Sequence, residues 1–262
     1  MSDQRRTFQT VVNEAVVDFM SDFLKNITHY NQKCKNGIIK YSTEKSNYFI
    51  SPFNEENLEG YKEKNQKLVI VLESPHIDEY FKNGQEIAEP VCANGKTGEN
   101  IIKCKDTMLA KMGLSIDKVD VFIINAIPYQ CSQGISTEVL RDFVWIKCWY
   151  EFGYSDLLAL LDKIKPDYIV NSCTKGCHFL PSSSSRNISK KYIEILVGKN
   201  SNKDIRCYKD TTGETEYSLR GFVNQCIKKY AENAEGIRLY QCAKHPCRWD
   251  GKFPAEELKE LN

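Results

Sequence analysis

Three short segments of the sequence carry acidic, amide and imidazole side chains directly after apolar runs. Glu73 follows the run 68–72, Asn125 ends the run 119–125, and His245 follows the last such run. A carboxylate can activate water, an amide can recognise a base edge, and an imidazole can stabilise charge on a leaving group. Each turn alone is more often structural, because Ser, Asn, Asp and Pro are common caps and turn formers. The three together favour a catalytic site.

The apolar runs predict the strands that would position these side chains. Residues 68–72, 119–125 and 167–171 are separated by segments with helical periodicity around 100–112 and 139–164. Short, mostly unalternated strands spaced by helices are typical of a parallel sheet covered on both faces. We therefore expect an α/β fold, a three-layer α/β/α arrangement around a mainly parallel four-stranded sheet whose last strand is 237–241. Ligands of such sheets bind beyond the carboxyl ends of the strands.

One domain is expected to span residues 1–262. Apolar residues at three- and four-residue steps predict an amphipathic N-terminal helix over 7–27, and a similar stripe predicts a helix over 219–230. Residues 30–66 and 176–216 are polar and show no sustained period, and we interpret them as insertions. A short edge strand is expected at 47–53.

Composition limits the classes of partner. The formal net charge is +1, so no global field draws the chain to nucleic acid, and any DNA-binding face must be local. The first residues are polar, and no apolar run is long enough to span a bilayer. We expect a cytoplasmic monomer without membrane contacts, whose eleven cysteines are reduced thiols.

The strand ends resemble those of the uracil-DNA glycosylase superfamily, in particular its family-four branch. The similar segments are Leu72-Glu-Ser-Pro-His76 to Gly-Glu-Ala-Pro-Gly, Gly95–Gly98 to Gly-x-Ala-Gly, Val121–Asn125 to a strand ending in Asn, Lys165–Val170 to Lys-Pro-x-x-Ile-Val, and His245-Pro246-Cys247 to His-Pro-Ser. The resemblance covers residues 67–175 and 237–249. It implies a uracil-DNA glycosylase-like fold and hydrolysis of the N-glycosidic bond of a flipped-out base in DNA.

The resemblance also implies roles for individual residues. Glu73 would position or activate the attacking water, with Asp78 as its alternative. His245 would stabilise the charge on the departing base, and Asn125 would recognise the edge of that base.

The remaining base-pocket candidates are Ser74, His76, Tyr129 and Ala93. Ala93 falls where the family carries a stacking Phe, so the pocket need not fit plain uracil. Tyr129, together with the neighbouring Tyr80 and Phe81, could replace that stacking ring. We therefore expect a modified base, such as a bulky cytosine derivative of phage DNA, with uracil as the alternative, and a role in antiviral defence.

Five residues are candidates for DNA contact: Lys175, Ser183, Lys244, Arg248 and Trp249. The basic and hydroxyl side chains could bind phosphates, and Trp249 could act as an apolar wedge beside the His-Pro turn. Ordinary surface charge explains the basic residues nearly as well.

Cofactors are not expected. Family-four relatives bind an iron–sulfur cluster through four cysteines, and Cys131 and Cys148 are similar to two of them, but the amino-terminal Cys-x-x-Cys is missing. A four-iron cluster needs four thiolates, for which only Cys34 and Cys104 could stand in. Zinc is disfavoured because Cys242, His245 and Cys247 belong to no paired ligand motif.

Two other functions remain open at this stage. The same fold could be a non-catalytic nucleic-acid-binding module, which near-zero net charge fits equally well. It could also be a nucleoside or nucleotide N-glycosidase, because a base pocket does not require a duplex groove.

Overall fold

The computed structural model describes residues 32–55, 65–82, 84–131, 141–176, 208–209, 215–216 and 218–261. The predicted helix at 7–27 and nearly all of the predicted insertion 176–216 lie outside these residues. None of the helices within the described ranges has the length and apolar character needed to cross a membrane.

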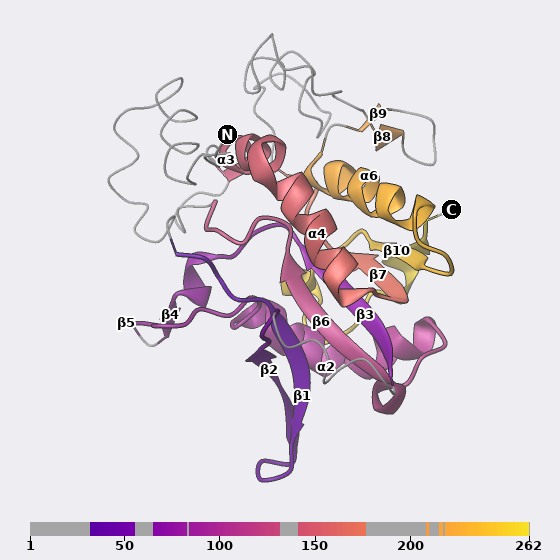
Figure 1. Cartoon of the computed structure of the whole chain (residues 1–262). Coiled ribbons are helices and arrows are strands. Elements are labelled where there is room, and N and C mark those ends of the chain that lie inside the picture. Colours follow the sequence, from indigo (N-terminus) through magenta and orange to yellow (C-terminus); the bar gives the residue numbers. More distant parts are fainter. Residues whose placement is uncertain are drawn as a thin grey trace.

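A seven-stranded mixed sheet forms the centre of the described chain, in the order β11-β10-β7-β3-β6-β1-β2 (Figure 1). Its strands are β1 (Gly37–Ser42), β2 (Asn47–Pro52), β3 (Gln66–Leu72), β6 (Val119–Asn125), β7 (Tyr168–Asn171), β10 (Arg238–Cys242) and β11 (Leu258–Glu260). Strands β10, β7, β3 and β6 are parallel to one another. Strand β11 pairs antiparallel with β10, and β1 pairs antiparallel with β6. Two small hairpins pair β4 (Phe81–Lys82) with β5 (Gln85–Glu86), and β8 (Tyr208–Lys209) with β9 (Thr215–Glu216).

The parallel four-stranded core matches the sequence prediction, but the sheet is larger than predicted. Strands β1 and β2 come from the stretch 30–66, which was expected to be an insertion with at most one edge strand. Only Gly37 and Ile38 of β1 pair with β6, and the rest of β1 leaves the core as a hairpin with β2. A strand that is buried only over its first half lacks the regular alternation from which it could have been recognised.

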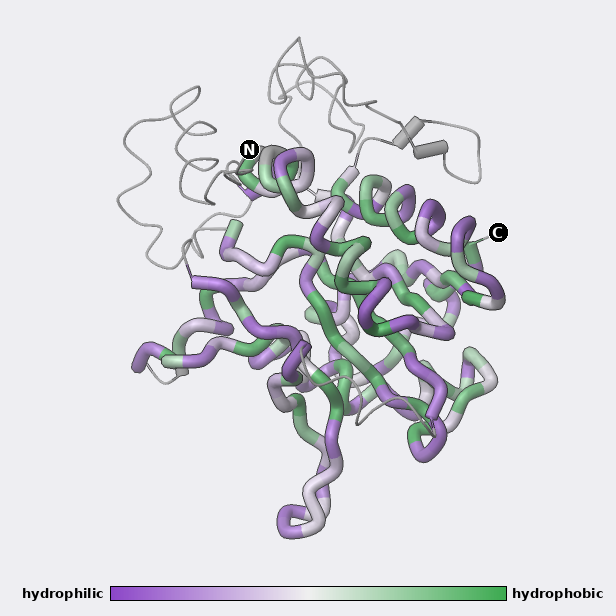
Figure 2. Tube along the Cα trace, viewed as in Figure 1, coloured by the Kyte–Doolittle hydropathy of each residue, from purple (hydrophilic) through white to green (hydrophobic). Residues whose placement is uncertain are grey.

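Helices cover both faces of the sheet. Helix α2 (Lys96–Lys111) packs on one face, while α3 (Arg141–Cys148), a π-helical turn (Trp149–Gly153), α4 (Tyr154–Ile164) and α6 (Leu219–Glu232) pack on the other. Hydrophobic residues line the central strands, whereas the tip of the β1–β2 hairpin is more hydrophilic (Figure 2). Four short 3₁₀ helices complete the described elements: η3 (Ile77–Glu79), η4 (Ile116–Lys118), η6 (Pro246–Arg248) and η7 (Ala255–Glu257).

The order of the parallel strands determines where a site can form. The chain passes from β3 to β6 on one side, and later places β7 and β10 on the other side of β3. The direction of winding therefore reverses between β3 and β7. In open α/β sheets, ligands bind at such a reversal, beyond the carboxyl ends of the strands.

Candidate functional site

A cleft of about 420 Å³ lies at this reversal point. The segment after β3, the turn after β10, the first residues of α2, Arg141 of α3 and the end of β7 all contribute to its wall. Its lining residues are Leu72, Glu73, Ser74, Pro75, His76, Asp78, Glu79, Gly95, Lys96, Thr97, Arg141, Thr174, Gly176, His245, Cys247 and Arg248. The described lining is rich in charged groups and contains no Phe, Tyr or Trp.

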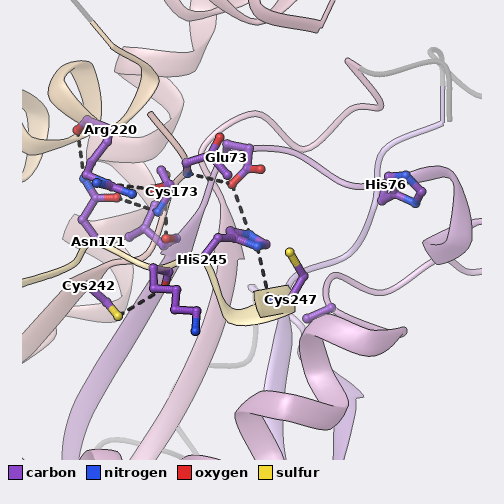
Figure 3. A network of polar contacts seen from close by, with 12 residues as sticks. Glu73, His76, Asn171, Cys173, Arg220, Cys242, His245 and Cys247 are labelled. Atoms are coloured by element: carbon purple, nitrogen blue, oxygen red, sulfur yellow. Dashed lines mark hydrogen bonds and ion pairs between the residues drawn. The ribbon is translucent and has the colours of Figure 1, made fainter. Parts of the chain in front are cut away.

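An acid–imidazole pair occupies the wall of this cleft (Figure 3). The Nε2 atom of His245 lies 3.3 Å from Oε2 of Glu73, and the two side chains are 12% and 9% exposed. The backbone N–H of Thr174 also donates to Oε2, at 3.3 Å. Since Thr174 follows β7, which lies between β3 and β10, the pair spans the ends of three parallel strands.

Helix α3 holds Glu73 at both its side chain and its backbone. Arg141 Nη1 lies 3.8 Å from Glu73 Oε1, and Trp145 Nε1 donates to the Glu73 carbonyl at 2.7 Å. The indole of Trp145 is itself stacked on Trp149, with ring centroids 4.9 Å apart. These contacts fix the carboxylate before any ligand binds.

Electrostatics favours the charged form of both members of the pair. Burial opposes ionisation of Glu73, but the charges of His245 and Arg141 and the hydrogen bond to His245 lower its pKa to about 2. Burial also disfavours the imidazolium, but the Glu73 carboxylate raises the pKa of His245 to about 10. Glu73 is therefore a permanent anion near neutral pH.

We expect Glu73→Gln to lower the free energy of unfolding by an amount that passes through a maximum as the pH is varied. A lowered carboxyl pKa stabilises the fold above the usual value of 4.5 and ceases to do so as the pH falls toward 2. A raised imidazole pKa stabilises the fold below 6.5 and ceases to do so as the pH rises toward 10. The difference in unfolding free energy between wild type and Glu73→Gln should thus be largest between pH 4.5 and 6.5.

Urea denaturation at a series of pH values measures this difference. Glu99→Gln is the matched control, because Glu99 is an exposed carboxylate of α2 whose cation partner, Lys103, is also exposed. A Glu73→Gln difference that stayed constant across the pH range would contradict the coupled pair.

A second carboxyl, that of Glu79, shapes the rim of the cleft. Its two oxygens accept backbone N–H bonds from His76 and from Ala93, the latter at 2.9 Å. Burial raises the pKa of Glu79 to about 8, although these two hydrogen bonds oppose the rise. Glu79 thereby caps η3 and fixes His76 and Asp78, which pair at 3.2 Å on the exposed side of the turn.

Behind the pair, buried Arg220 of α6 ties together the ends of β7 and β10. It donates to the carbonyl of Cys173 at 2.8 Å and to the carbonyl of Ala243. Asn171 in turn donates to the Arg220 carbonyl and to Asn224, and accepts from the N–H of Cys173 (Figure 3). This network sets the spacing between the strand that precedes Thr174 and the one that precedes His245.

Six residues predicted from the sequence line the cleft: Glu73, Ser74, His76, Asp78, His245 and Arg248. Arg141, Thr174 and Lys96 were not predicted. Arg141 could have been suspected, because it begins a helical segment that contains Phe, Val, Trp and Ile, and its charge must be paired once it is buried. Nothing in the local sequence indicates that Thr174 donates its backbone N–H to Glu73.

Asn125 does not share the cleft. It lines a second cavity of about 260 Å³ beside α4, together with Lys33, Asn36 and Asp156. Its amide nitrogen and oxygen are buried, and neither has a hydrogen-bond partner among the described residues. The predicted convergence of three turns therefore holds for two of them, and Asn125 is not placed to contact a ligand beside Glu73.

Three further candidates are buried or packed elsewhere. Ala93 is 1% exposed and lies behind Glu79, and Tyr129 packs its ring against Phe152, so neither lines the cleft. Trp249 is also 1% exposed, with its indole N–H bound to the Lys244 carbonyl and its ring against Phe253. Trp249 is therefore a core residue and not an exposed wedge for DNA. Burial of its large apolar ring stabilises the fold by removing apolar surface from water.

The other predicted DNA contacts have mixed positions. Lys244 is exposed and Lys175 is half-buried, but neither lines the cleft, while Ser183 lies outside the described residues. The proposed stacking substitutes Tyr80 and Phe81 do not line the cleft either, and Tyr80 is fully buried.

The described residues do not fit a metal or an iron–sulfur cluster. Within these ranges no group of three or more His, Cys, Asp or Glu could hold a metal ion. Cys131 and Cys148 are buried and hydrogen-bonded to each other, but two thiols are too few for a four-iron cluster. Cys242 donates its thiol to the Lys244 carbonyl instead of facing His245.

Fold and site together define an α/β protein with a mixed sheet and a buried acid–imidazole pair at the reversal point of that sheet. Comparison with protein families, curated proteins and solved structures finds no match to the chain. The glycosylase resemblance therefore rests on the sequence motifs alone.

Proposed function

We propose that the chain is a DNA glycosylase that hydrolyses the N-glycosidic bond of a flipped-out, modified base. One observation carries the proposal: Glu73 and His245, the two residues to which the resemblance assigns catalysis, face each other in one cleft. The two residues are separated by about 170 residues of sequence, yet the fold places both assigned side chains in the same cleft.

The charge states suit this chemistry. The transition state of glycoside hydrolysis resembles an oxocarbenium ion, which a permanently ionised Glu73 would stabilise while it orients the attacking water. A protonated His245 would donate to the base as negative charge develops on it. Thr174 also lines the cleft, and its buried hydroxyl has no hydrogen-bond partner among the described residues.

The described cleft lacks an aromatic ring on which a base could stack. His76, whose side chain is 45% exposed at the rim, is the planar group best placed to do so. A base bearing polar substituents would compensate for weaker stacking through Ser74, Thr97 and Arg248.

The substrate prediction can be checked with duplexes bearing either uracil or glucosylated hydroxymethylcytosine, followed by heating in alkali. We expect strand cleavage at the modified cytosine. Cleavage confined to uracil would overturn the modified-base assignment. Release from the free nucleoside at the rate seen with the oligonucleotide would instead indicate a nucleoside N-glycosidase.

A second candidate, a nucleic-acid-binding module without catalysis, is favoured by one observation. Both carboxylate oxygens of Glu73 already have protein partners, Arg141 on one and His245 with Thr174 on the other. A purely structural carboxylate would have the same contacts. Such a module would bind the duplexes above and release no base from any of them.

A further inference from the structure

The thiol of Cys247 is set apart from the other cysteines of the described chain. Eight of the nine described cysteines are buried, whereas Cys247 is partly exposed and lines the cleft. It is the central residue of η6, a turn fixed to α2 by the hydrogen bond from Asn100 Nδ2 to the Pro246 carbonyl, at 2.9 Å.

Cys247 forms one end of a thiol–imidazole–carboxylate series. The Nδ1 side of His245 faces Cys247, whose backbone N–H donates to it at 3.2 Å. The Nε2 side of the same ring faces Glu73 at 3.3 Å (Figure 3). A nucleophile, a base beside it and a group that orients the base are the parts of an activated nucleophile.

The ring can stabilise a thiolate as well as a thiol. In the neutral ring, Nδ1 accepts the Cys247 N–H; in the imidazolium, Nδ1 carries a proton and donates it to the sulfur instead. Glu73 favours the imidazolium, because its carboxylate remains bound at Nε2. Consistent with this, burial and the charge of Glu73 act to raise the pKa of Cys247, but the interaction with His245 and the charge of Arg248 outweigh them and lower it.

Other charged groups line the same cleft as this thiol: the acids Glu73, Asp78 and Glu79, the cations Lys96, Arg141 and Arg248, and the imidazole of His76. The first turn of α2 presents unpaired N–H groups, which favour an anion. Among the described cysteines whose pKa is shifted, Cys247 alone has a lowered value.

We propose that Cys247 is a nucleophilic thiol that small soft electrophiles, hydroperoxides among them, modify covalently inside the cleft, with the imidazolium of His245 as the partner of its thiolate and Glu73 holding that imidazolium. The thiol releases its proton to solvent, and a lone pair of the thiolate sulfur attacks the distal oxygen of the hydroperoxide. The O–O bond breaks, and the alkoxide leaves with the bonding pair and takes a proton from the imidazolium, which regains one from solvent. Sulfur is oxidised to sulfenic acid, and the peroxide is reduced to an alcohol.

Iodoacetamide provides a direct probe, because the sulfur displaces iodide and leaves a stable thioether. The native full-length protein is alkylated for short times between pH 6 and 9, and the rate at each cysteine is obtained by peptide mass spectrometry. This mapping separates Cys247 from Cys177 and Cys207, which lie outside the described residues. We expect Cys247 to react before the eight buried cysteines and to retain reactivity at pH 7.

Glu73→Gln tests the role assigned to the pair. Since each unit of thiol pKa changes the thiolate fraction about tenfold, we expect alkylation of Cys247 at pH 7 to slow by roughly tenfold. Glu99→Gln should leave the rate unchanged. A pH profile with the midpoint of an ordinary thiol, about 8.5, would overturn the proposal even if Glu73→Gln failed to fold.

The outcome is independent of the proposed glycosylase activity, since alkylation requires no DNA. A Cys247 that reacts as slowly as the buried cysteines would overturn this inference and leave the glycosylase proposal intact. A fast-reacting Cys247 in a protein that releases no base would support this inference and overturn the glycosylase proposal.

Discussion

Replacement of Glu73 by Gln is expected to lower the rate of base release by about 10²–10⁴-fold, the usual contribution of a general base. The amide keeps the shape of the side chain but cannot carry the charge that the proposed reaction requires beside the sugar, and it weakens the ion pair with His245. His245→Ala should cause a loss of similar size. Because the two groups act as a pair, the double variant should lose little more than either single variant.

Single-turnover base release and DNA binding are measured on the same protein preparations. DNA affinity should change little in Glu73→Gln, since removal of a carboxylate does not remove a phosphate contact. The control is Glu99→Gln, which neutralises an exposed carboxylate outside the cleft lining. Base release at the wild-type rate in Glu73→Gln would exclude Glu73 from the chemistry.

Arg220→Leu is expected to destabilise the fold by roughly 2–5 kcal/mol, because one buried and one partly buried carbonyl lose their charged donor. These carbonyls belong to Cys173 and Ala243, at the ends of β7 and β10. Leucine fills much of the space but supplies no hydrogen bond, and the strand ends that carry Thr174 and His245 would separate. Urea denaturation followed by circular dichroism measures the loss.

Arg238→Leu is the matched control for Arg220→Leu. Arg238 lies on β10 and pairs with Glu260, but both side chains are nearly half exposed. An exposed ion pair contributes about 1 kcal/mol or less, so this variant should be nearly as stable as wild type. Equal losses in the two variants would show that burial of Arg220 has no special importance.

The central elements could be predicted from sequence because their patterns are strong. β6 spans the residues predicted for it, and β3, β7, β10, α2 and α6 lie close to their predicted positions. Continuous runs of Val and Ile arise in strands that are buried on both faces. Apolar stripes at helical spacing arise in helices that are buried on one face. Strand β1 is buried only over its first half, and the edge strand β11 has three residues of which two are exposed, so burial leaves little pattern in their sequences.

The sequence could predict the position of a site residue only where the direction of its strand determines which edge of the sheet the residue reaches. Glu73 and His245 follow parallel strands, so both must reach the same edge of the sheet. Asn125 ends β6, which lies on the side of β3 away from β7 and β10, and it lines a cavity with Lys33 and Asn36. The order of the strands across the sheet is not encoded in the apolar runs, and this order separates Asn125 from the pair.

The two halves of the pair are anchored very differently. Glu73 follows β3, which has parallel neighbours on both sides, and its carbonyl and carboxylate are both bound to α3. His245 is carried on a short turn between β10 and η6, near one side of the sheet. New specificities could therefore evolve by exchange of Lys244 and Arg248, the exposed residues of that turn, around an acid that stays in place, since neither side chain takes part in the bonds that tie β7 to β10.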